Sequence, residues 1–477
     1  MVRKTIHSIH TNISDLKRNV LHILDLIPLS TSSVAPTFSI AAAYGVVVSL
    51  AGPQAIMSTF LTAIPFILVA LIFRQFNIHY PNAGASYHWS TKIIGKKFGA
   101  FQAWVVTLAY FFSIPPIVIP AGEYTLALLY SLRIISYSVY SNQLWIALTG
   151  IIWVIISAIP LILGAKPTAR FTETFLAVEL IILGLFLGFG FTNFKVVNPF
   201  STSWFFDPNV NWSGIILAMI VAATIVDGWE IDSYSSEESK KPRQWPGLSG
   251  IIGLISVLII YAITMPLMTI ETPLNSLSSS VDPLFTWAQN VVPSYAWLIN
   301  LAVLTSTASS LWLTAFILSR AWYAMARDNL LPSIFGWLHN RFRSPWANIL
   351  IMSGLNILIN TLMLVSPSVQ SFFTIVLSAA GIFLAMEFFM DSISGIVFFW
   401  FKHKPMGRES LKEHVHWIYR IISVLSSLGL GAIVVLGLYF SPSTIGQQFV
   451  YIFAGLMVFS ILFIYRAKKI KVREFAI

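Results

Sequence analysis

Long apolar stretches alternate with short polar segments along almost the whole chain. Each stretch holds about 20 residues, which in a helix is enough to cross a hydrocarbon core of roughly 30 Å. Lipid offers no hydrogen-bond partner to an open backbone, so the spanning element must be a helix. The pattern predicts an all-α polytopic membrane protein of about 12 spans, at residues 25–49, 53–76, 99–130, 142–164, 173–193, 213–235, 247–270, 294–326, 347–365, 370–401, 415–439 and 444–466.

Two of these spans contain residues that stop a helix. Span 1 has a run of hydroxyl residues before Pro36, and span 6 has Gly228 between two acids. Irregular backbone at membrane depth is tolerated where it lines a cavity or is buried in protein. Because the breaks lie five spans apart, the broken helices run in opposite directions, which predicts an inverted repeat of spans 1–5 and 6–10 with a substrate site between the breaks. The alternative is a simple kink at Pro36 and a water-filled crevice at Asp227.

The predicted repeat divides the chain into four parts. Residues 25–401 form the ten-helix transport core, and residues 402–466 contain spans 11 and 12. Residues 1–24 and 467–477 are expected to be cytoplasmic tails, since the first segment lacks the order of a cleavable signal peptide. Gly184 and Gly188 form a small-residue pair in span 5, which predicts close helix packing there.

Charge supports the membrane interpretation and gives it a direction. Only 10% of the residues are charged, and the mean hydropathy is +0.77. Of 29 Lys and Arg residues, Arg133 and Lys195 alone fall on one side of the predicted topology. This is the positive-inside pattern, with both termini cytoplasmic in a cell membrane. The formal charge of +10 therefore reflects orientation and anionic lipid rather than nucleic acid. The chain has no cysteine, which excludes disulfides and thiol catalysis.

A broken helix supplies free N–H groups at one half-helix end and free carbonyls at the other. An amino acid carries the complementary pair. Its carboxylate would face N–H groups near residues 33–35 and near Gly228, and its ammonium would face carbonyls near Thr31 and residues 223–226. Tyr110 and Trp312 are aromatic candidates from spans 3 and 8. The predicted substrate-binding residues are Thr31, Ser32, Ser33, Val34, Ala35, Tyr110, Thr224, Val226, Asp227, Gly228 and Trp312.

Four blocks of sequence carry a family resemblance. They are Ser32-Ser33-Val34-Ala35-Pro36 with Ala51-Gly52-Pro53, Tyr80-Pro81-Asn82-Ala83-Gly84-Ala85-Ser86-Tyr87-His88-Trp89, Gly228-Trp229-Glu230 with Glu237-Glu238-Ser239-Lys240-Lys241-Pro242-Arg243, and Ser319-Arg320-Ala321-Trp322-Tyr323-Ala324-Met325-Ala326-Arg327-Asp328. With these blocks the chain resembles, over its whole length, an amino-acid permease of the amino acid-polyamine-organocation (APC) superfamily.

The resemblance implies two inverted five-helix bundles, a central site at the unwound parts of spans 1 and 6, and alternating access with uptake or exchange of amino acids or amines. The chain departs from the family pattern in two places. Span 1 lacks the glycine-rich break of many relatives, and residues 222–226 lack the aromatic that many relatives place before the glycine of span 6. Both differences bear on the gate and on side-chain specificity.

Ionisable residues inside spans are expensive and are functional candidates by default. The acids at such positions are Glu123, Glu179, Asp227, Glu230, Glu387 and Asp391. Glu179 or Asp227 is expected to take up a proton during transport, because desolvation favours the neutral form of a carboxyl. Asp391 is expected near the membrane interface, satisfied by water or Lys402. Permanent pairing with neighbouring hydroxyls is the alternative role for these acids.

A sodium site is the alternative to a proton-coupling residue. It would use the span 1 backbone and hydroxyls of span 8, for which the candidates are Thr305, Ser306, Thr307, Ser309 and Ser310.

These observations favour a secondary active transporter that moves amino acids across the cytoplasmic membrane, coupled to protons. A polyamine or amine carrier, with Asp227 and Glu230 as cation partners, and an amino-acid exchanger are the alternatives. No motif of a membrane enzyme, such as His-Glu-x-x-His, is present. We expect no cofactor and no catalytic or metal-ligating residues. The partners are a small molecule, the lipid bilayer, and a proton or sodium ion.

Overall fold

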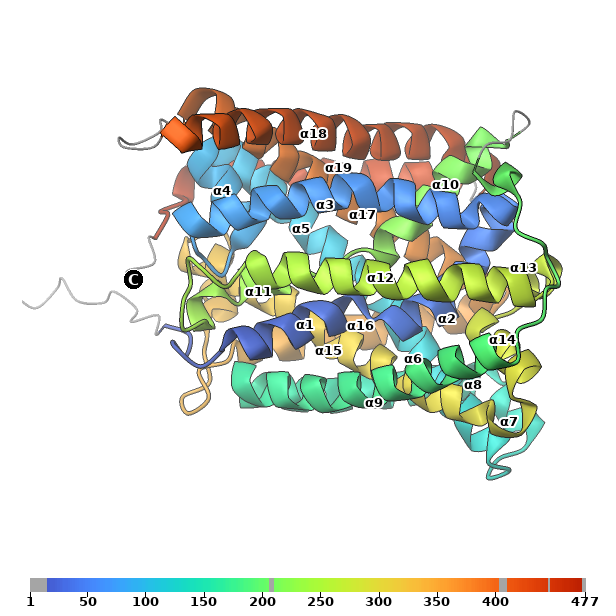
Figure 1. Cartoon of the computed structure of the whole chain (residues 1–477). Helices are drawn as coiled ribbons and strands as arrows, with labels where there is room; N and C mark the ends of the chain where they lie inside the picture. The colour runs from blue at the N-terminus through green and yellow to red at the C-terminus, as the bar shows by residue number, and fades with distance from the viewer. Residues whose placement is uncertain (1–14, 206–209, 403–409, 445–446, 474–477) are drawn as a thin grey trace, which may run out of the picture.

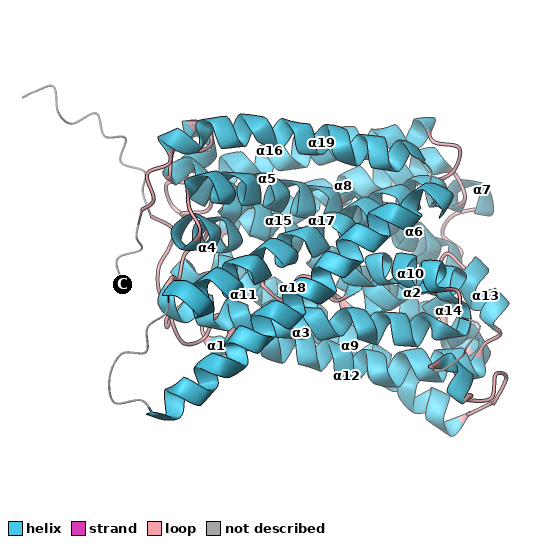
Figure 2. Cartoon of the chain, turned by 90° about the horizontal axis from the view of Figure 1, so that it is seen from above, coloured by secondary structure: helices cyan, strands magenta, loops and turns pink. Residues whose placement is uncertain are grey.

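A computed structural model describes residues 15–205, 210–402, 410–444 and 447–473, which form helices joined by short connections (Figures 1 and 2). Ten helical stretches are long and apolar enough to cross a membrane. The first, residues 23–79, contains spans 1 and 2, and Trp212–Ile225 is a shorter apolar helix that begins span 6. The prediction of an all-α polytopic protein with about 12 spans is confirmed.

The first five spans are built from helices that include two short connectors. In chain order they are α1 (Ile23–Val34), α2 (Pro36–Ala51), α3 (Ala55–His79), α4 (Ala85–Ile93), α5 (Lys96–Ser113), α6 (Pro115–Ser131), α7 (Tyr137–Tyr140), α8 (Gln143–Leu163) and α9 (Ala165–Thr192). Helix α9 begins eight residues before the predicted span, because hydropathy locates the part that crosses lipid and not the polar first turns.

The second group of spans and the two C-terminal helices follow. They are α10 (Trp212–Ile225), α11 (Ile231–Tyr234), α12 (Leu248–Glu271), α13 (Leu274–Ser279), α14 (Pro283–Val291), α15 (Trp297–Arg327), α16 (Trp346–Leu362), α17 (Val369–Val397), α18 (Ser410–Thr444) and α19 (Gln447–Arg466). Short 3-10 turns lie at Gly52–Gln54, Thr202–Trp204, Ser236–Glu238, Pro293–Tyr295, Ser333–Gly336, Met363–Val365 and Ala467–Lys469, and a π turn lies at Phe398–Lys402.

The long helices lie side by side in one bundle, with α18 along one edge and α9 along the opposite edge (Figure 1). We call the end of the bundle with α4 and α11 the terminal end, because both described chain ends lie there. The segment after α19 is tied to the end of α15, since the Lys471 N–H donates to the Asp328 carbonyl at 3.0 Å. We call the end with α7, α13 and α14 the distal end (Figure 1).

The predicted close packing at Gly184 and Gly188 is wrong for contacts within the described part of the chain. A Cβ built at either glycine meets no heavy atom within 4 Å. Both residues lie on the part of α9 where neighbouring side chains such as Ile181 and Leu185 are exposed. Sequence spacing identifies a smooth helix face but not whether another helix of the same chain covers it.

A buried polar layer closes the terminal end. Arg327 makes a bidentate pair with Glu237, at 2.6 and 2.7 Å, and Arg320 makes a second with Glu238, at 3.1 and 3.3 Å. Arg327 also donates to Asn82 Oδ1 at 3.2 Å. All five side chains are at most 5% exposed. We define these residues as the polar layer; they come from three of the four sequence blocks that carry the resemblance.

We expect Arg327→Ala to destabilise the protein by about 3–5 kcal/mol, because removal of one partner leaves the other charge buried and uncompensated. The thermal unfolding midpoint of the purified protein in detergent is the measurement. Arg243→Ala, at an exposed position of the loop that follows the layer, is the control and is expected to leave the midpoint unchanged. Equal midpoints for Arg327→Ala and the native protein would show that the layer does not hold this end together.

Candidate functional site

Span 1 is interrupted at a single residue. Ala35 adopts the left-handed conformation, with φ 54° and ψ 69°, between the end of α1 and Pro36, the first residue of α2. A non-glycine residue in this region is uncommon and is held there by its surroundings. The break therefore separates two half-helices and is more than a proline kink.

Span 6 is interrupted over several residues, from Val226 to Glu230, between α10 and α11. Gly228 has φ 103°, a conformation that side-chain-bearing residues rarely adopt. A Cβ at Gly228 would lie 2.7 Å from both the carbonyl carbon and the carbonyl oxygen of Ser33. The two breaks thus touch backbone to backbone, which confirms the predicted pairing of broken helices 1 and 6.

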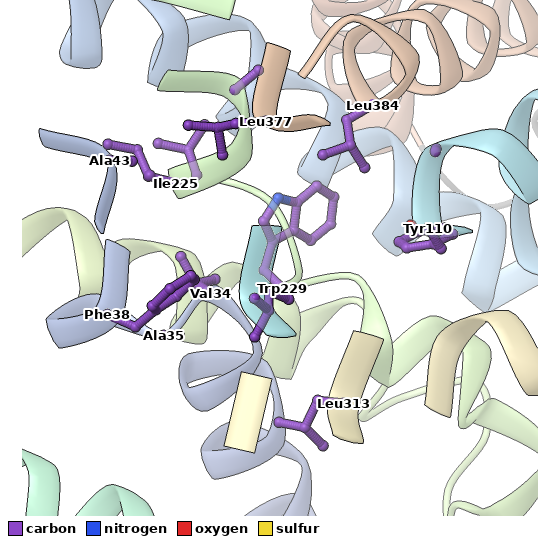
Figure 3. Close-up of a cluster of buried hydrophobic side chains, with 14 of the residues drawn as sticks. Val34, Ala35, Phe38, Ala43, Tyr110, Ile225, Trp229, Leu313, Leu377 and Leu384 are labelled. Atoms are coloured by element: carbon purple, nitrogen blue, oxygen red, sulfur yellow. The ribbon is translucent and has the colours of Figure 1, made fainter. Parts of the chain in front are cut away.

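A small cavity of about 40 Å³, the central cavity, lies beside the paired breaks. Figure 3 shows the apolar part of this region, where Val34 and Phe38 face Leu377 and Leu384 across the interrupted backbone. Four predicted substrate residues line the cavity, namely Ser33, Val34, Thr224 and Asp227. Its other polar lining residues are Ser39, Ser113, Ser310 and Thr314.

The polar groups of the cavity differ in whether they have partners. Asp227 is 8% exposed, and its Oδ1 atom has no hydrogen-bond partner among the described residues. Ser33 Oγ is likewise buried without one. Thr224, by contrast, donates to the Val221 carbonyl at 2.7 Å. Asp227 Oδ1 and Ser33 Oγ are therefore two groups at the cavity that have no protein partner among the described residues.

The other predicted residues lie around the cavity but do not line it. Ala35, Val226 and Gly228 form the backbone of the breaks. Thr31 donates to the Ile27 carbonyl at 3.0 Å, and its own carbonyl accepts the Ala35 N–H at 3.3 Å.

Three further candidates have side-chain partners on other helices. Ser32 donates to Ser309 Oγ at 2.7 Å. Trp312 donates to Thr172 of α9 at 2.9 Å, and Tyr110 contacts Glu230 on the terminal side of the breaks.

Glu179 of α9 caps the half-helix that begins after the span 1 break. Its Oε1 atom accepts the Thr37 N–H at 2.9 Å and the Ser306 hydroxyl at 2.7 Å. Ser306 Oγ in turn accepts the Phe38 N–H at 3.1 Å. A helix N-terminus favours an anion because its first N–H groups are unpaired and its dipole is positive there. In this structure the protein's own carboxylate takes that place.

Glu230 has the same role in the span 6 break. Its Oε2 atom accepts the Gly228 N–H at 3.0 Å, and its Oε1 atom accepts the Tyr110 hydroxyl at 2.9 Å. The N–H groups that were expected to be free for a substrate carboxylate near Gly228 and at the start of α2 are thus already paired. A substrate carboxylate would have to compete with an internal one at each break.

The Tyr110 hydroxyl links Glu230 to a second acid, Glu387 of α17, at 3.3 Å. Glu387 Oε1 also accepts hydrogen bonds from Tyr234, at 2.9 Å, and from Ser86, at 3.0 Å. Every one of these side chains is fully buried. We define Glu230, Tyr110, Glu387, Tyr234 and Ser86 as the acid network.

Asp391 lies one helical turn beyond Glu387. The expected pairing of Asp391 with Lys402 is wrong. Asp391 is fully buried and accepts a hydrogen bond from Gln102 at 3.4 Å. Lys402 instead donates to the Lys92 carbonyl at 3.5 Å. The π turn at the end of α17 carries Lys402 towards the last turn of α4, which contains Lys92.

Some functional candidates were outside the predicted site. Glu387 was identified as an acid in a span, but Ser86 carried no signal beyond membership of a motif block, and Tyr234 carried none beyond its place in predicted span 6. Asp232 was missed: it accepts the Gly247 and Gly250 N–H groups, each at 2.6 Å, and so caps the start of α12. An acid two residues after Glu230 gives no sequence signal for such a cap.

The predicted sodium ligands meet span 1 through hydrogen bonds. Ser310 donates to the Ser33 carbonyl at 3.4 Å, and Ser309 accepts from Ser32. In the described ranges, no group of three or more His, Cys, Asp or Glu side chains is placed to hold a metal ion. The hydroxyls of span 8 therefore lie next to the backbone of span 1, as a sodium site would require. One of these hydroxyls, Ser306, also contacts Glu179, the candidate for proton coupling.

The bundle of spans and the paired breaks define a multi-pass membrane transport protein. The sequence model of the family described as "Amino acid permease" matches residues 21–470, and the chain belongs to this family.

Three relatives illustrate the range of the family. Cationic amino acid transporter 4 of Mus musculus is 24% identical over 79% of this chain, but the match spans only 59% of that protein's length. The branched-chain amino acid permease BcaP of Lactococcus lactis subsp. cremoris (strain MG1363) is 24% identical over 71% of this chain and 75% of its own. The low-affinity putrescine importer PlaP of Escherichia coli (strain K12) is 24% identical over 78% and 79%. The names of the family and of these relatives are those of transporters and permeases, not of enzymes.

We expect Gly228→Ala to separate the two breaks, because its Cβ would overlap the Ser33 backbone and its φ would be strained. The predicted result is a loss of substrate binding of about tenfold or more together with a lower unfolding midpoint, since left-handed strain alone costs about 1–3 kcal/mol. Equilibrium binding to the purified protein is the measurement. Gly188→Ala, where a Cβ meets nothing within 4 Å, is the matched control. Native-like binding by Gly228→Ala would show that the contact is dispensable.

Proposed function

We propose that this protein is a secondary active transporter that moves amino acids across the cytoplasmic membrane by alternating access, coupled to protons. The observation that carries the proposal is that the Glu179 carboxylate accepts the Thr37 N–H at the start of α2. Thr37 is the residue before Phe38, which lines the central cavity. The same N–H groups suit the carboxylate of an amino acid. Proton and substrate can therefore be linked through one group of donors.

The linkage follows from charge. While Glu179 is ionised, it holds the Thr37 N–H and opposes a second carboxylate at the same helix end. When Glu179 binds a proton, its attraction to the helix terminus weakens and the donor becomes available to the substrate. Substrate binding then favours the protonated protein, and protonation favours substrate binding by the same factor. Glu230, which holds the Gly228 N–H, and the unpartnered Asp227 are the corresponding candidates at span 6.

Two further assignments complete the proposal. The terminal end is assigned to the cytoplasm, because the positive-inside rule places Lys and Arg there, and this makes both termini cytoplasmic. The polar layer would then be the cytoplasmic gate, which is closed in this structure. The central cavity of about 40 Å³ has to widen before it can hold an amino acid.

A second candidate function is transport of amines. The observation that favours it is that each break already carries its own carboxylate, Glu179 or Glu230. A substrate without a carboxylate would not need to displace either one. Its ammonium would face Asp227 Oδ1 and the acid network, as a charge-assisted hydrogen bond requires. Exchange of substrates without a proton gradient is the third mode that the same site permits.

Uptake into liposomes tests these functions. Purified protein is given leucine, arginine, 1,4-diaminobutane and butylamine, with and without an inward proton gradient. Gradient-stimulated uptake of leucine and arginine supports the amino-acid proton symporter. Uptake of the two amines alone supports the amine carrier, and counterflow with no effect of the gradient supports exchange. No transport of any of these compounds contradicts both candidate functions.

We expect Glu179→Gln to remove the dependence of substrate affinity on pH, because the amide cannot exchange a proton. Coupling between two ligands is typically about 1–3 kcal/mol, a factor of about 5–150 in affinity. In the native protein that factor should appear as tighter amino-acid binding at acidic than at neutral pH. The variant should bind the amino acid with the same affinity at acidic and at neutral pH, and it should lose gradient-stimulated uptake. Asp15→Asn, at an exposed acid, is the control. Retained pH dependence in Glu179→Gln would remove Glu179 from the coupling mechanism.

A further inference from the structure

A second, larger cavity lies at the distal end, with a volume of about 620 Å³. It is bounded by α6, the short helix α7, the turn between α13 and α14, and the first turn of α15. The residues with charged, phenolic or amide side chains among its lining are Glu123, Tyr124, Tyr130, Tyr137, Tyr140, Asp282, Gln289, Asn300 and Gln370. No Lys or Arg is among the described residues that line it. We call it the distal cavity.

The distal cavity is separate from the central one but lies on the same helix. Ile117 of α6 lines the central cavity, and Glu123 of α6 lines the distal cavity. Six residues of helix place Glu123 about 9 Å farther towards the distal end. The two cavities share no lining residue. A ligand in the distal cavity would therefore not occupy the paired breaks.

Asp282 is held rigidly at the wall of this cavity. Its Oδ1 atom accepts the Phe285 N–H at 2.8 Å and so caps the start of α14. Its own N–H donates to Ser280 Oγ at 3.0 Å, and that hydroxyl is linked to Thr286 at 2.7 Å. The second carboxylate oxygen, Oδ2, is buried and has no partner among the described residues. The turn therefore fixes one oxygen and leaves the other without a protein partner among the described residues.

Asn300 gives an independent sign of a missing ligand. Its side chain, from the first turn of α15, is 2% exposed and lines the distal cavity. Its Nδ2 atom has no hydrogen-bond partner in the described structure. Buried polar groups are paired in native proteins in the great majority of cases, so an unpaired amide at the wall of a cavity points to a polar ligand or water.

The tyrosines of the distal cavity form an aromatic wall. The Tyr130 and Tyr140 rings are stacked, with centroids 5.3 Å apart and an interplanar angle of 7°. The Tyr137 ring contacts Tyr130 edge-on at 5.9 Å. Aromatic faces attract an ammonium group and pack against an aliphatic stem. Together with two carboxylates, this wall excludes anions and suits an organic cation.

We propose that the distal cavity is a second binding site, which takes small organic cations with a primary ammonium on an aliphatic stem and holds the ammonium between Glu123 and Asp282. The stem lies against the tyrosine rings, and Asn300 pairs with a polar group of the ligand or with a bridging water. The site collects such cations above the central cavity, since a cleft lined by one sign of charge raises the local concentration of the opposite ion.

Equilibrium binding of radiolabelled 1,4-diaminobutane to the purified full-length protein in nanodiscs tests the proposal. We expect a saturable binding component that Glu123→Gln and Asp282→Asn each weaken about tenfold or more, and that the double variant abolishes. Both substitutions preserve shape, and asparagine remains a good N-cap for α14. Glu271→Gln, at the same end of the bundle and paired with Trp287 at 2.6 Å, is the control and should bind like the native protein.

The outcomes separate this site from the transport function. Asp227→Asn, in the central cavity, should leave the distal component intact. Binding that is unchanged in the Glu123→Gln, Asp282→Asn double variant, with an unfolding midpoint like that of the native protein, overturns the distal site, whatever the uptake assay shows. A distal component in a protein that transports none of the tested compounds supports the site and contradicts the transport proposal instead.

The same binding should weaken on acidification. Burial raises the pKa of Asp282 to about 7, although the Phe285 N–H favours its charged form. The groups that face it are Glu123 and Tyr124 of α6 and Tyr137 and Tyr140 of α7. Protonation of Glu123 acts in the same direction as protonation of Asp282, because each removes a negative charge from the cavity. We expect diamine affinity to fall roughly tenfold from pH 8 to pH 6; tighter binding at pH 6 would contradict the assignment.

Discussion

Backbone hydrogen bonding at the two helix breaks is the constraint on which the rest of this structure depends. Lipid cannot satisfy an open N–H or carbonyl group, so each interruption has to find its partners inside the protein. Glu179 supplies a partner at the start of α2, and Glu230 supplies one at Gly228. Asp232 does the same for the start of α12. Acidic side chains that hydropathy marks as costly are thus placed where helix ends favour an anion.

This placement changes the meaning of the acids in the spans. An acid that only caps a helix would be structural, and an acid that only binds protons would need no helix end. At Glu179 and Glu230 the same carboxyl group would do both: it would cap a helix end when ionised and release the N–H group when protonated. The acid network extends Glu230 to Glu387 through the Tyr110 hydroxyl, so hydrogen bonds join the span 6 break to α17.

The fold and the pairing of the two helix breaks could be predicted from the sequence, because both follow from strong local patterns. Apolar length gives the spans, and Pro36 and Gly228 mark the breaks. The partners of individual side chains could not be predicted. The predicted pairing of Lys402 with Asp391 was wrong, because the π turn at the end of α17 redirects Lys402. A Cβ built at Gly184 meets no heavy atom within 4 Å, so a small-residue packing motif does not identify which helix packs against it. Tyr234 and Ser86 converge on Glu387 only through the tertiary arrangement of three distant helices.

The chemistry of the polar layer determines how expensive it is to open this end of the protein. A seal made of packed aliphatic side chains would cost about 25 cal/mol for each Å² exposed to water. The Arg327–Glu237 and Arg320–Glu238 pairs behave differently, because each ion lost hydration when it was buried and regains it when water enters. The hydration recovered offsets most of the attraction that is given up. In the proposed role of a gate, such ionic closure would be specific when shut, yet shallow in free energy.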